Sequence, residues 1–497
     1  MSWWNSSKTF PMRIFLVALI LRLIPVVVMR NMGIGLDDMF QYDMLARSIS
    51  TGNGYRWYAE ADLPIVLPYL KLDLSSINYD SRGVLTSFRP PLYPAFLAII
   101  YFVFGTGPTR FFIARIFQAI LAACMAPLTY AVAKRLFRNR ESTAKISTWI
   151  IVLYPMLVVY PLSLATENLF FVLVLSSFLC LLKAQTSLET AGIPGKKISS
   201  LIIRSRWFIL SGFLLGLTCL TRSVAQIYAV MAMGWVWLFL KERKMAIIVF
   251  MVAGVTVSPW IARNSLLYGK LTGIETAIGY DLYLGYHPQG TSTFQYPQSL
   301  DLMTMMNDSE RDSIGIQSAI GFIKTNPGRV LYLILRRTGY FFGLESRALT
   351  YFYSNDFFGY LPPPLIIGII TIFCLPFTII VTSAVFGLAQ TGFKTEIWLL
   401  VLLLIGYAAP HMLIIAEERF HLALVPFLSI LAARCWTGGW SAIIHNWFIS
   451  NQRKTMTIAA FVIVLLLVIN WGMQIGRNAD KLATLMSPNG NQSYFSY

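Results

Sequence analysis

Eleven stretches of this chain are apolar over about the length that a helix needs to cross a bilayer, roughly 20 residues. We expect these spans at 11–28, 109–133, 146–165, 168–182, 207–220, 224–240, 245–261, 365–389, 397–416, 420–433 and 456–473. Hydrophobic residues make up 56% of the chain and charged residues only 13%, whereas soluble domains carry about 25% charged residues. The sequence therefore predicts an all-α polytopic membrane protein and excludes a soluble enzyme, a coiled coil or a disordered chain.

The basic residues predict which loops face the cytoplasm. Thirteen of the 40 Lys and Arg residues fall in three short loops, at 134–145, 183–206 and 241–244. Cytoplasmic loops carry such an excess, so we expect the N-terminus inside, the first span to be an uncleaved anchor and the C-terminus outside. The net charge of +17 is then explained by the membrane, and we expect no nucleic-acid partner.

Two long segments face outward in this topology, at about 29–108 and 264–360. In the first, residues 89–105 are apolar but short, which predicts an interfacial or re-entrant helix. In the second, residues 308–328 predict a juxtamembrane amphipathic helix with Ile316, Ile320 and Ile323 on its apolar face. We divide the chain into a membrane module, 1–435, and a remainder, 436–497, with a cytoplasmic amphipathic segment, the last span and an outer tail.

Charged residues at the outer ends of the spans are candidates for function, because charges near membrane depth are costly. These residues are Asp37, Asp38, Arg89, Glu167, Arg222, Arg263, Glu417, Glu418, Arg419 and His421. The planar guanidinium of Arg suits phosphate, and a neighbouring carboxylate can act as a general base towards a hydroxyl. For any one of them, a solvated turn is an equally good explanation, and Asp37 and Asp38 could simply cap a helix.

Five stretches together resemble a known class of membrane enzymes. They are GLDDMFQYDMLARSISTGNGY (35–55), RPPLYPAFLAIIYFVFG (89–105), ARIFQAILAACMAPLTYAVAKRLF (114–137), YPLSLATENLFF (160–171) and GFLLGLTCLTRSVA (212–225). VSPWIARNSLLYGKL (257–271) and AEERFHLALVPFL (416–428) add weaker support. In this order and spacing they resemble the GT-C class of polyprenyl-phosphate-sugar-dependent glycosyltransferases, in the branch with protein O-mannosyltransferases and aminoarabinose transferases. The resemblance covers about residues 10–435.

The resemblance implies roles for particular residues. It places a catalytic acid directly after the first span, here Asp37, with Asp38 beside it and their division of labour open. Tyr42 and Arg89 match positions that line the same cavity. Motif positions with less settled roles are matched by Glu167, Arg222, Arg263, Glu418 and Arg419. We find no Asp-x-Asp metal motif, so no metal ligands are assigned and the need for a divalent metal stays open.

The function implied is transfer of a sugar, with inversion, from a polyprenyl-phosphate donor to a hydroxyl of a lipid, glycan or protein. The reaction is expected on the outer face of the cell inner (plasma) membrane, in cell-envelope glycan, glycolipid or protein glycosylation. A transporter or flippase of a lipid-linked sugar is the main alternative, although it would favour polar residues within the spans and inverted repeats. A polymerase or ligase of the same broad fold is a third.

Overall fold

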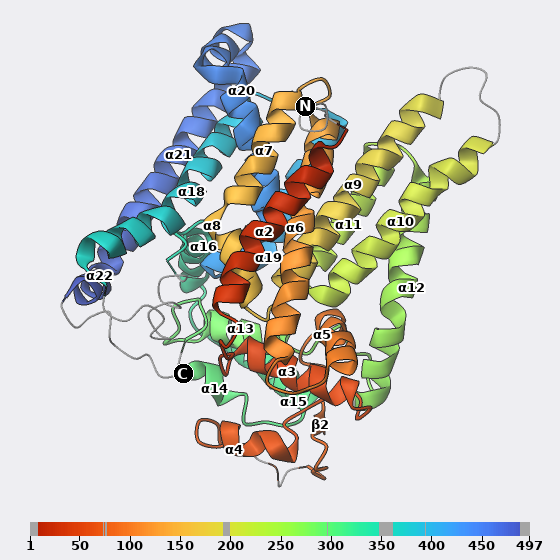
Figure 1. The fold of residues 1–497 in the computed structure, drawn as a ribbon, viewed down its shortest axis with the longest axis vertical. Coiled ribbons are helices and arrows are strands. Elements are labelled where there is room, and N and C mark those ends of the chain that lie inside the picture. The colour runs from red at the N-terminus through yellow and green to blue at the C-terminus, as the bar shows by residue number, and fades with distance from the viewer. Residues whose placement is uncertain are drawn as a thin grey trace.

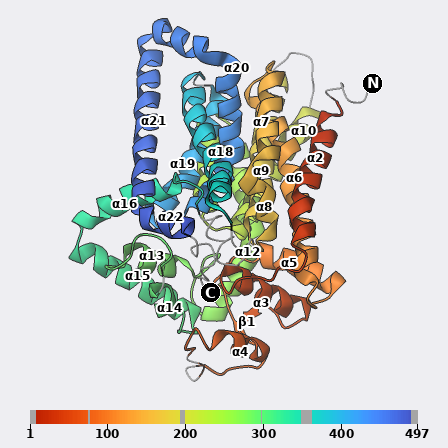
Figure 2. The same ribbon diagram turned by 60° about the vertical axis from the view of Figure 1, so that its left-hand side comes forward.

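The computed structural model describes residues 8–72, 74, 77–191, 199–295, 297–346, 361–392 and 394–487. Long helices form a bundle, with shorter elements gathered at one end of it, the lower end in Figures 1 and 2. The bundle helices are α2 (Phe10–Val28), α6 (Arg110–Leu136), α7 (Glu141–Leu153), α9 (Glu167–Ala191), α10 (Ser199–Thr221), α11 (Ala225–Leu238), α12 (Arg243–Tyr268), α18 (Pro363–Ala389), α19 (Thr395–Leu413), α20 (Val425–Ile449) and α21 (Asn451–Arg477). The chain is a multi-pass helical membrane protein, as the composition predicts.

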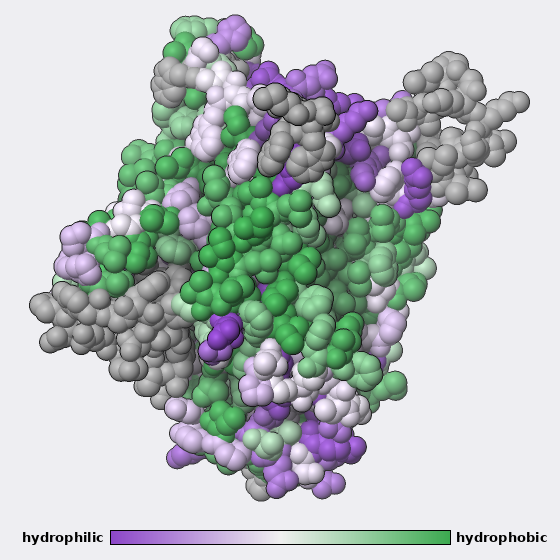
Figure 3. All heavy atoms as spheres, in the orientation of Figure 1, coloured by the Kyte–Doolittle hydropathy of each residue, from purple (hydrophilic) through white to green (hydrophobic). Residues whose placement is uncertain are grey.

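The structure has helices at the places of the predicted spans, and fewer of these helices than eleven have the length of a span. Ten of the eleven predicted stretches fall mainly in one helix each, whereas 146–165 is divided among Glu141–Leu153, Pro155–Val159 and Tyr160–Leu162. Only eight helices among the described residues are long and apolar enough to cross alone. A ninth span results if the pair Glu141–Leu153 and Pro155–Leu162, bent by 57°, crosses as one. The described part of α10 and all of α11 are shorter, so the count of eleven stays a prediction. A hydrophobic belt between hydrophilic ends is visible on the surface in Figure 3.

Small residues let the bundle helices approach closely, as is usual in membranes, where apolar contact alone gives little selectivity. A Cβ on Gly387 of α18 would lie 1.9 Å from the carbonyl oxygen of Leu431 on α20. Similarly, a Cβ on Gly212 or Gly216 of α10 would collide with α12. These close approaches fix which helices are neighbours, and therefore which helix ends meet at the lower end.

The break after α7 exposes backbone carbonyls that lipid cannot satisfy. The chain continues through α8 (Pro155–Val159) and the 3₁₀ turn η2 (Tyr160–Leu162) before α9 begins. Fully buried Arg115 donates from Nε to Leu162 O (2.8 Å), and Gln118 donates to Pro161 O (3.2 Å) and Ser163 O (3.0 Å). Side chains of α6 thus hold the irregular chain that leads into Glu167.

The two long segments cover the lower end of the bundle. The first contains α3 (Asp38–Ser50), β1 (Arg56–Trp57), η1 (Glu60–Asp62), α4 (Leu63–Val66), β2 (Val84–Leu85) and α5 (Leu92–Phe104), with β1 and β2 paired antiparallel. The second contains α13 (Ile278–Tyr286), α14 (Gln298–Asp301), α15 (Asp308–Thr325) and α16 (Gly328–Phe341). With 13 residues, α5 is too short to span and packs on α3, which agrees with the predicted interfacial helix.

The amphipathic helix predicted at 308–328 is present as α15, and a second face of it packs into the protein. Its buried positions include Arg311, Gly315 and Ala319, whereas Ile320 is 46% exposed. Small residues face α13 because the two backbones nearly touch, and larger isoleucines would hold them apart. The division predicted at residue 435 stays a prediction, and it falls inside α20, which bends at Gly439 (φ 68°). Only Ser450 separates α20 from α21, and α22 (Ala479–Met486) follows α21.

Candidate active site

A cavity of about 480 Å³ opens at the lower end of the bundle, between the helix ends and the two long segments. Six of the nine predicted site residues line it, namely Asp38, Tyr42, Arg89, Glu167, Arg222 and Arg419. They come from five separate places in the chain: α3, the approach to α5, the start of α9, the α10–α11 turn and the 3₁₀ helix η3 (Glu418–Leu424). The fold thus gathers residues that are hundreds of positions apart.

Asp38 links two of the arginines. Its Oδ1 lies 2.5 Å from Arg89 Nη2, and its Oδ2 lies 3.0 Å from Arg419 Nη2. Arg89 also donates from Nε to Gln41 Oε1 (2.8 Å), and Arg419 Nε lies 2.8 Å from Glu417 Oε2. Each guanidinium is therefore held in one orientation while part of it still lines the cavity.

The third arginine has its own carboxylate. Arg222 Nη1 lies 2.8 Å from Glu167 Oε1, and the Glu167 side chain is only 4% exposed. Burial lowers the pKa of Arg222, but the neighbouring acidic groups, Glu167 first among them, together outweigh burial and raise that pKa above its usual value. Burial also opposes the charge of Arg89, but Asp38 and the other acidic groups nearby together raise the pKa of Arg89 above its usual value. Both guanidiniums stay charged at any physiological pH.

Tyr42 supplies a neutral hydroxyl beside these charges. Arg89 Cζ lies 5.6 Å from the centre of its ring, within the range of a cation–π contact. Burial raises the pKa of Tyr42 to about 12, although Arg89 opposes the shift. The phenol therefore remains protonated and can donate a hydrogen bond to an anion in the cavity.

Three predicted site residues do not line the cavity. Asp37 is the N-cap of α3, its Oδ1 accepting from Met39 N at 2.9 Å. Arg263 donates to Thr86 O at 2.6 Å, joining α12 to the first long segment. Glu418 accepts from Ser346 N and from Gln474 Nε2 (2.5 Å), joining η3 to α21.

Three cavity-lining residues were missed by the sequence reasoning: Glu275, Asp281 and His411. Glu275 and Asp281 are the only charged residues of 271–286, a stretch rich in Tyr, Leu and Ile. The sequence signal that could have found them is two isolated acids in an apolar part of the second long segment. His411 lies at the end of α19, stacked on Phe420 with ring centres 4.4 Å apart.

The two missed acids differ in their surroundings. Glu275 accepts a hydrogen bond from Ser223 Oγ, next to Arg222. Asp281, on α13, accepts no side-chain hydrogen bond and forms no ion pair with any residue in the described ranges. Burial first, and then the charge of Glu275, raises the pKa of Asp281 to about 8, and burial also raises the pKa of Glu275. The cavity thus has three carboxylates with hydrogen-bonding or ion-pairing partners and one, Asp281, with none among the described residues.

Glycine contacts fix the position of α13 over the cavity. A Cβ on Gly279 would lie 2.0 Å from Asp312 O, and one on Gly315 would lie 2.3 Å from Gly279 O. At the other end of α13, a Cβ on Gly285 would lie 2.0 Å from Ile414 O, directly after α19. No larger residue fits at these positions, so α13 can approach α15 and the end of α19 closely enough to place Asp281.

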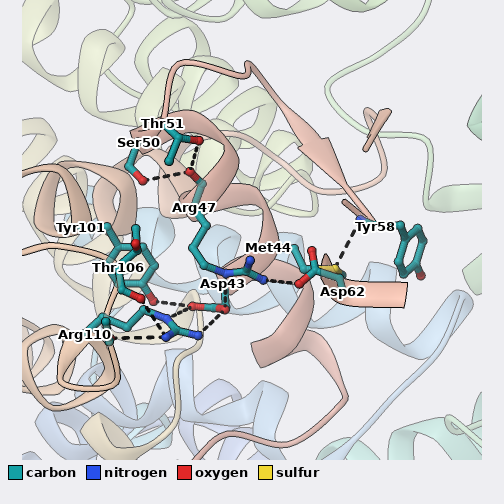
Figure 4. A network of polar contacts seen from close by, with 11 residues as sticks. Asp43, Met44, Arg47, Ser50, Thr51, Tyr58, Asp62, Tyr101, Thr106 and Arg110 are labelled. Carbon is teal, nitrogen blue, oxygen red and sulfur yellow. Dashed lines mark hydrogen bonds and ion pairs between the residues drawn. The ribbon is translucent and has the colours of Figure 1, made fainter. Parts of the chain in front are cut away.

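A buried network fixes α3, the helix that carries Asp38 and Tyr42 (Figure 4). Asp43 is fully buried and accepts from Tyr101 (2.9 Å), Arg47 (2.8 Å) and Arg110 (2.8 and 3.0 Å). Arg47 also reaches Asp62 of η1 at 2.6 Å. Because these partners lie on α5, α6 and η1, the network ties α3 to both the bundle and the first long segment.

The carboxylates of the cavity do not form an evident metal centre. Among the residues that the structure describes, no group of three or more His, Cys, Asp or Glu side chains could hold a metal ion. Asp38 and Glu167 are occupied by arginines, which compete with any cation for their oxygens. The residues present fit an anionic ligand better than a divalent cation.

Comparison with known proteins supports the fold. No protein-family model and no curated protein matches the sequence. The crystal structure of the Archaeoglobus fulgidus oligosaccharyltransferase tethered with an acceptor peptide aligns with a TM-score of 0.51 and 12% identity, over 100% of this chain and 61% of that one. AglB from the same archaeon, in complex with an inhibitory peptide and a dolichol-phosphate, gives 0.50 and 13%, over 99% and 61%.

A third solved structure is less similar. ArnT from Cupriavidus metallidurans, bound to undecaprenyl phosphate, aligns with a TM-score of 0.40 and 10% identity, over 89% of this chain and 80% of that one. The chain spans about three fifths of the length of the archaeal oligosaccharyltransferase, and at 12–13% identity the likeness shows the fold alone. The GT-C fold implied by the sequence motifs is confirmed.

Proposed function

We propose that this protein is a GT-C glycosyltransferase that moves a sugar, with inversion, from a polyprenyl-phosphate donor to an acceptor hydroxyl. The observation that carries the proposal is the cluster of Arg89, Arg222 and Arg419 in one cavity at the end of a membrane bundle. Guanidiniums hold phosphate oxygens with directed hydrogen bonds. The cavity also reaches the ends of membrane helices, where a lipid-linked phosphate would arrive.

The chemistry follows from the charges. As the sugar leaves, negative charge grows on the phosphate, and fixed cations stabilise it more than they stabilise the bound donor. A carboxylate of the cavity takes the proton of the attacking hydroxyl. Of the two acids that the sequence motifs suggest, Asp38 lines the cavity and Asp37 caps α3 beside it.

The side of the membrane follows from the basic loops, which favour a cytoplasmic location for 134–145, 183–206 and 241–244. The cavity would then open on the periplasmic or external face of the plasma membrane. A polyprenyl-phosphate sugar on that face needs no nucleotide, and its acceptor would be a lipid, glycan or protein of the cell envelope. AglB, of the same fold, has been solved with dolichol-phosphate and an inhibitory peptide, which is compatible with both partners.

The test is a transfer assay on purified protein in lipid nanodiscs. Undecaprenyl-phosphate-linked hexoses and pentoses, each radiolabelled in the sugar, are incubated with envelope lipid, glycan and protein fractions as acceptors. We expect one donor to lose its label to one fraction, and Arg89→Gln to reduce that transfer by at least about 100-fold, the scale of an electrostatic contact in the transition state.

The matched control is Arg82→Gln, which removes an exposed arginine of the same long segment, paired with Asp80 away from the cavity. It should transfer at the wild-type rate. If sealed vesicles move the intact labelled donor across the bilayer and no fraction acquires label, the protein is a transporter and the proposal is wrong.

A further inference from the structure

The four carboxylates of the cavity differ in what holds them. Asp38 pairs with Arg89 and Arg419, Glu167 pairs with Arg222, and Glu275 accepts from Ser223. Asp281 alone among these four has no hydrogen-bonding or ion-pairing partner in the described part of the chain. It lines the cavity from α13 in the second long segment, whereas the two ion-paired acids lie at the starts of α3 and α9.

Pairing decides which of these acids suits proton transfer. A carboxylate that forms ion pairs through both oxygens is a weak proton acceptor, because protonation would break attractive contacts with the guanidiniums. That describes Asp38, whose Oδ1 and Oδ2 each face an arginine. A general base works best when its pKa lies near the operating pH, and the pKa of Asp281 is about 8.

The position of Asp281 is also well determined. Two residues earlier, Gly279 N donates to Asp312 Oδ1 at 2.6 Å, and the Gly279–Gly315 contact leaves no room between α13 and α15. Four residues later, Gly285 packs directly against the carbonyl oxygen of Ile414, and its own carbonyl oxygen accepts a hydrogen bond from Arg337 Nη2. A catalytic group must be held within a fraction of an ångström, and α13 is held at both ends.

Resting on the proposed function, we propose that Asp281 is the catalytic base and that Asp38 is a positioning residue for the phosphate-binding arginines. The acceptor oxygen forms a bond to the anomeric carbon as the bond from that carbon to the phosphate oxygen breaks. The electron pair of the broken bond stays on the phosphate, and the acceptor proton moves to the carboxylate of Asp281. No oxidant or further reactant is needed.

The pH dependence of turnover follows from the charges around Asp281. Glu275 from the second long segment and Asp38 from α3 disfavour its ionised form, whereas Arg89 and Arg222 favour it. Burial also disfavours the ionised form, and its effect on the pKa is larger than that of any one of these charges. Only the ionised form can accept a proton, so kcat should rise between pH 7 and pH 9. The bound donor phosphate adds negative charge and would move this rise towards higher pH.

The experiment uses the donor and acceptor that wild-type protein consumes in the nanodisc assay, at pH 6 to 9.5. Asp281→Asn should lower kcat by at least about 100-fold, change the donor KM by less than about threefold, and abolish the rise near pH 8. Its affinity for undecaprenyl phosphate, measured by native mass spectrometry, should equal that of wild type. Asp281→Glu should recover part of the rate and retain the pH-dependent rise.

Asp301→Asn is the matched control, because Asp301 is an exposed acid of the same long segment that accepts from Tyr283 and does not line the cavity. It should behave as wild type. Asp281→Asn with wild-type kcat and pH profile would overturn the assignment of the base and leave the glycosyltransferase proposal intact. Loss of undecaprenyl phosphate affinity instead of kcat would show that Asp281 binds the donor. If wild type consumes no donor, both proposals fail.

Discussion

Asp38 and Arg419 are 381 residues apart in the chain and form an ion pair, with Oδ2 and Nη2 separated by 3.0 Å. Asp38 begins α3 in the first long segment, and Arg419 lies in η3, between α19 and α20. The contact can exist only after the first and last parts of the bundle have packed together. The candidate site is therefore a product of the whole fold, and its variants should separate site effects from folding effects.

Asp38→Asn and Asp37→Asn should differ strongly. Asn at 38 keeps the shape of the side chain but removes the charge that orients Arg89 and Arg419, so transfer should fall by about 10- to 100-fold. Asn at 37 is itself a good N-cap, so transfer should stay within about threefold of wild type. The rates are compared in the nanodisc assay at equal protein. Equal, large losses in both variants would instead favour direct catalysis by Asp37.

Breaking the Glu167–Arg222 pair should destabilise the protein. Glu167→Gln leaves the Arg222 charge desolvated and without its carboxylate, which costs about 3 to 5 kcal/mol for a buried pair. The double variant Glu167→Gln/Arg222→Gln should be less destabilised, because no lone charge remains. Unfolding in detergent, followed by tryptophan fluorescence, measures the differences.

The control for this comparison is the exposed pair Arg138–Glu189, whose side chains are 51% and 43% exposed. Glu189→Gln should cost no more than about 1 kcal/mol. If Glu167→Gln costs as little as Glu189→Gln, the Glu167–Arg222 contact does not hold the α9 and α10 ends together.

Two glycines of α15 provide a test of the roof of the cavity. Gly315→Ala places a methyl group 2.3 Å from Gly279 O, so α13 must move away from α15 and Asp281 with it. Gly321→Ala in the same helix meets nothing within 4 Å and should be neutral or stabilising by up to about 1 kcal/mol, the helix preference of Ala. We expect transfer to drop only in Gly315→Ala. Equal activity of the two proteins would mean that the position of α13 is unimportant for turnover.

Membrane orientation can be tested with single cysteines. Glu310 of α15 and Lys244 of α12 are both exposed and lie in segments that we place on opposite sides. In intact cells, a membrane-impermeant maleimide should label Glu310→Cys and should label Lys244→Cys only after the membrane is permeabilised. Wild-type protein serves as the background, since four of its five cysteines are buried and the fifth, Cys124, is half-buried within α6. The opposite pattern would put the cavity on the cytoplasmic side.

The sequence by itself determined the class of fold and the end of the bundle where the site lies. Apolar stretches near 20 residues must form helices in lipid, because no other partner satisfies their backbone. All the predicted stretches except the broken 146–165 fall mainly in one helix each. Charged residues at the ends of such helices stay outside the hydrocarbon core, because burying a charge in lipid is costly. The alternation of the spans then puts Asp38, Arg89, Arg222 and Arg419 at the same end of the bundle.

Only the tertiary structure decided which of those charges share a cavity. Adjacent residues such as Asp37 and Asp38 point in different directions at a helix start, so one caps α3 and the other meets two arginines. Arg263 and Glu418 were indistinguishable from cavity residues in sequence, but their partners are backbone and side chains elsewhere. Asp281 reaches the cavity because Gly279 and Gly315 let two helices touch, and a contact between distant residues leaves no local pattern in the sequence.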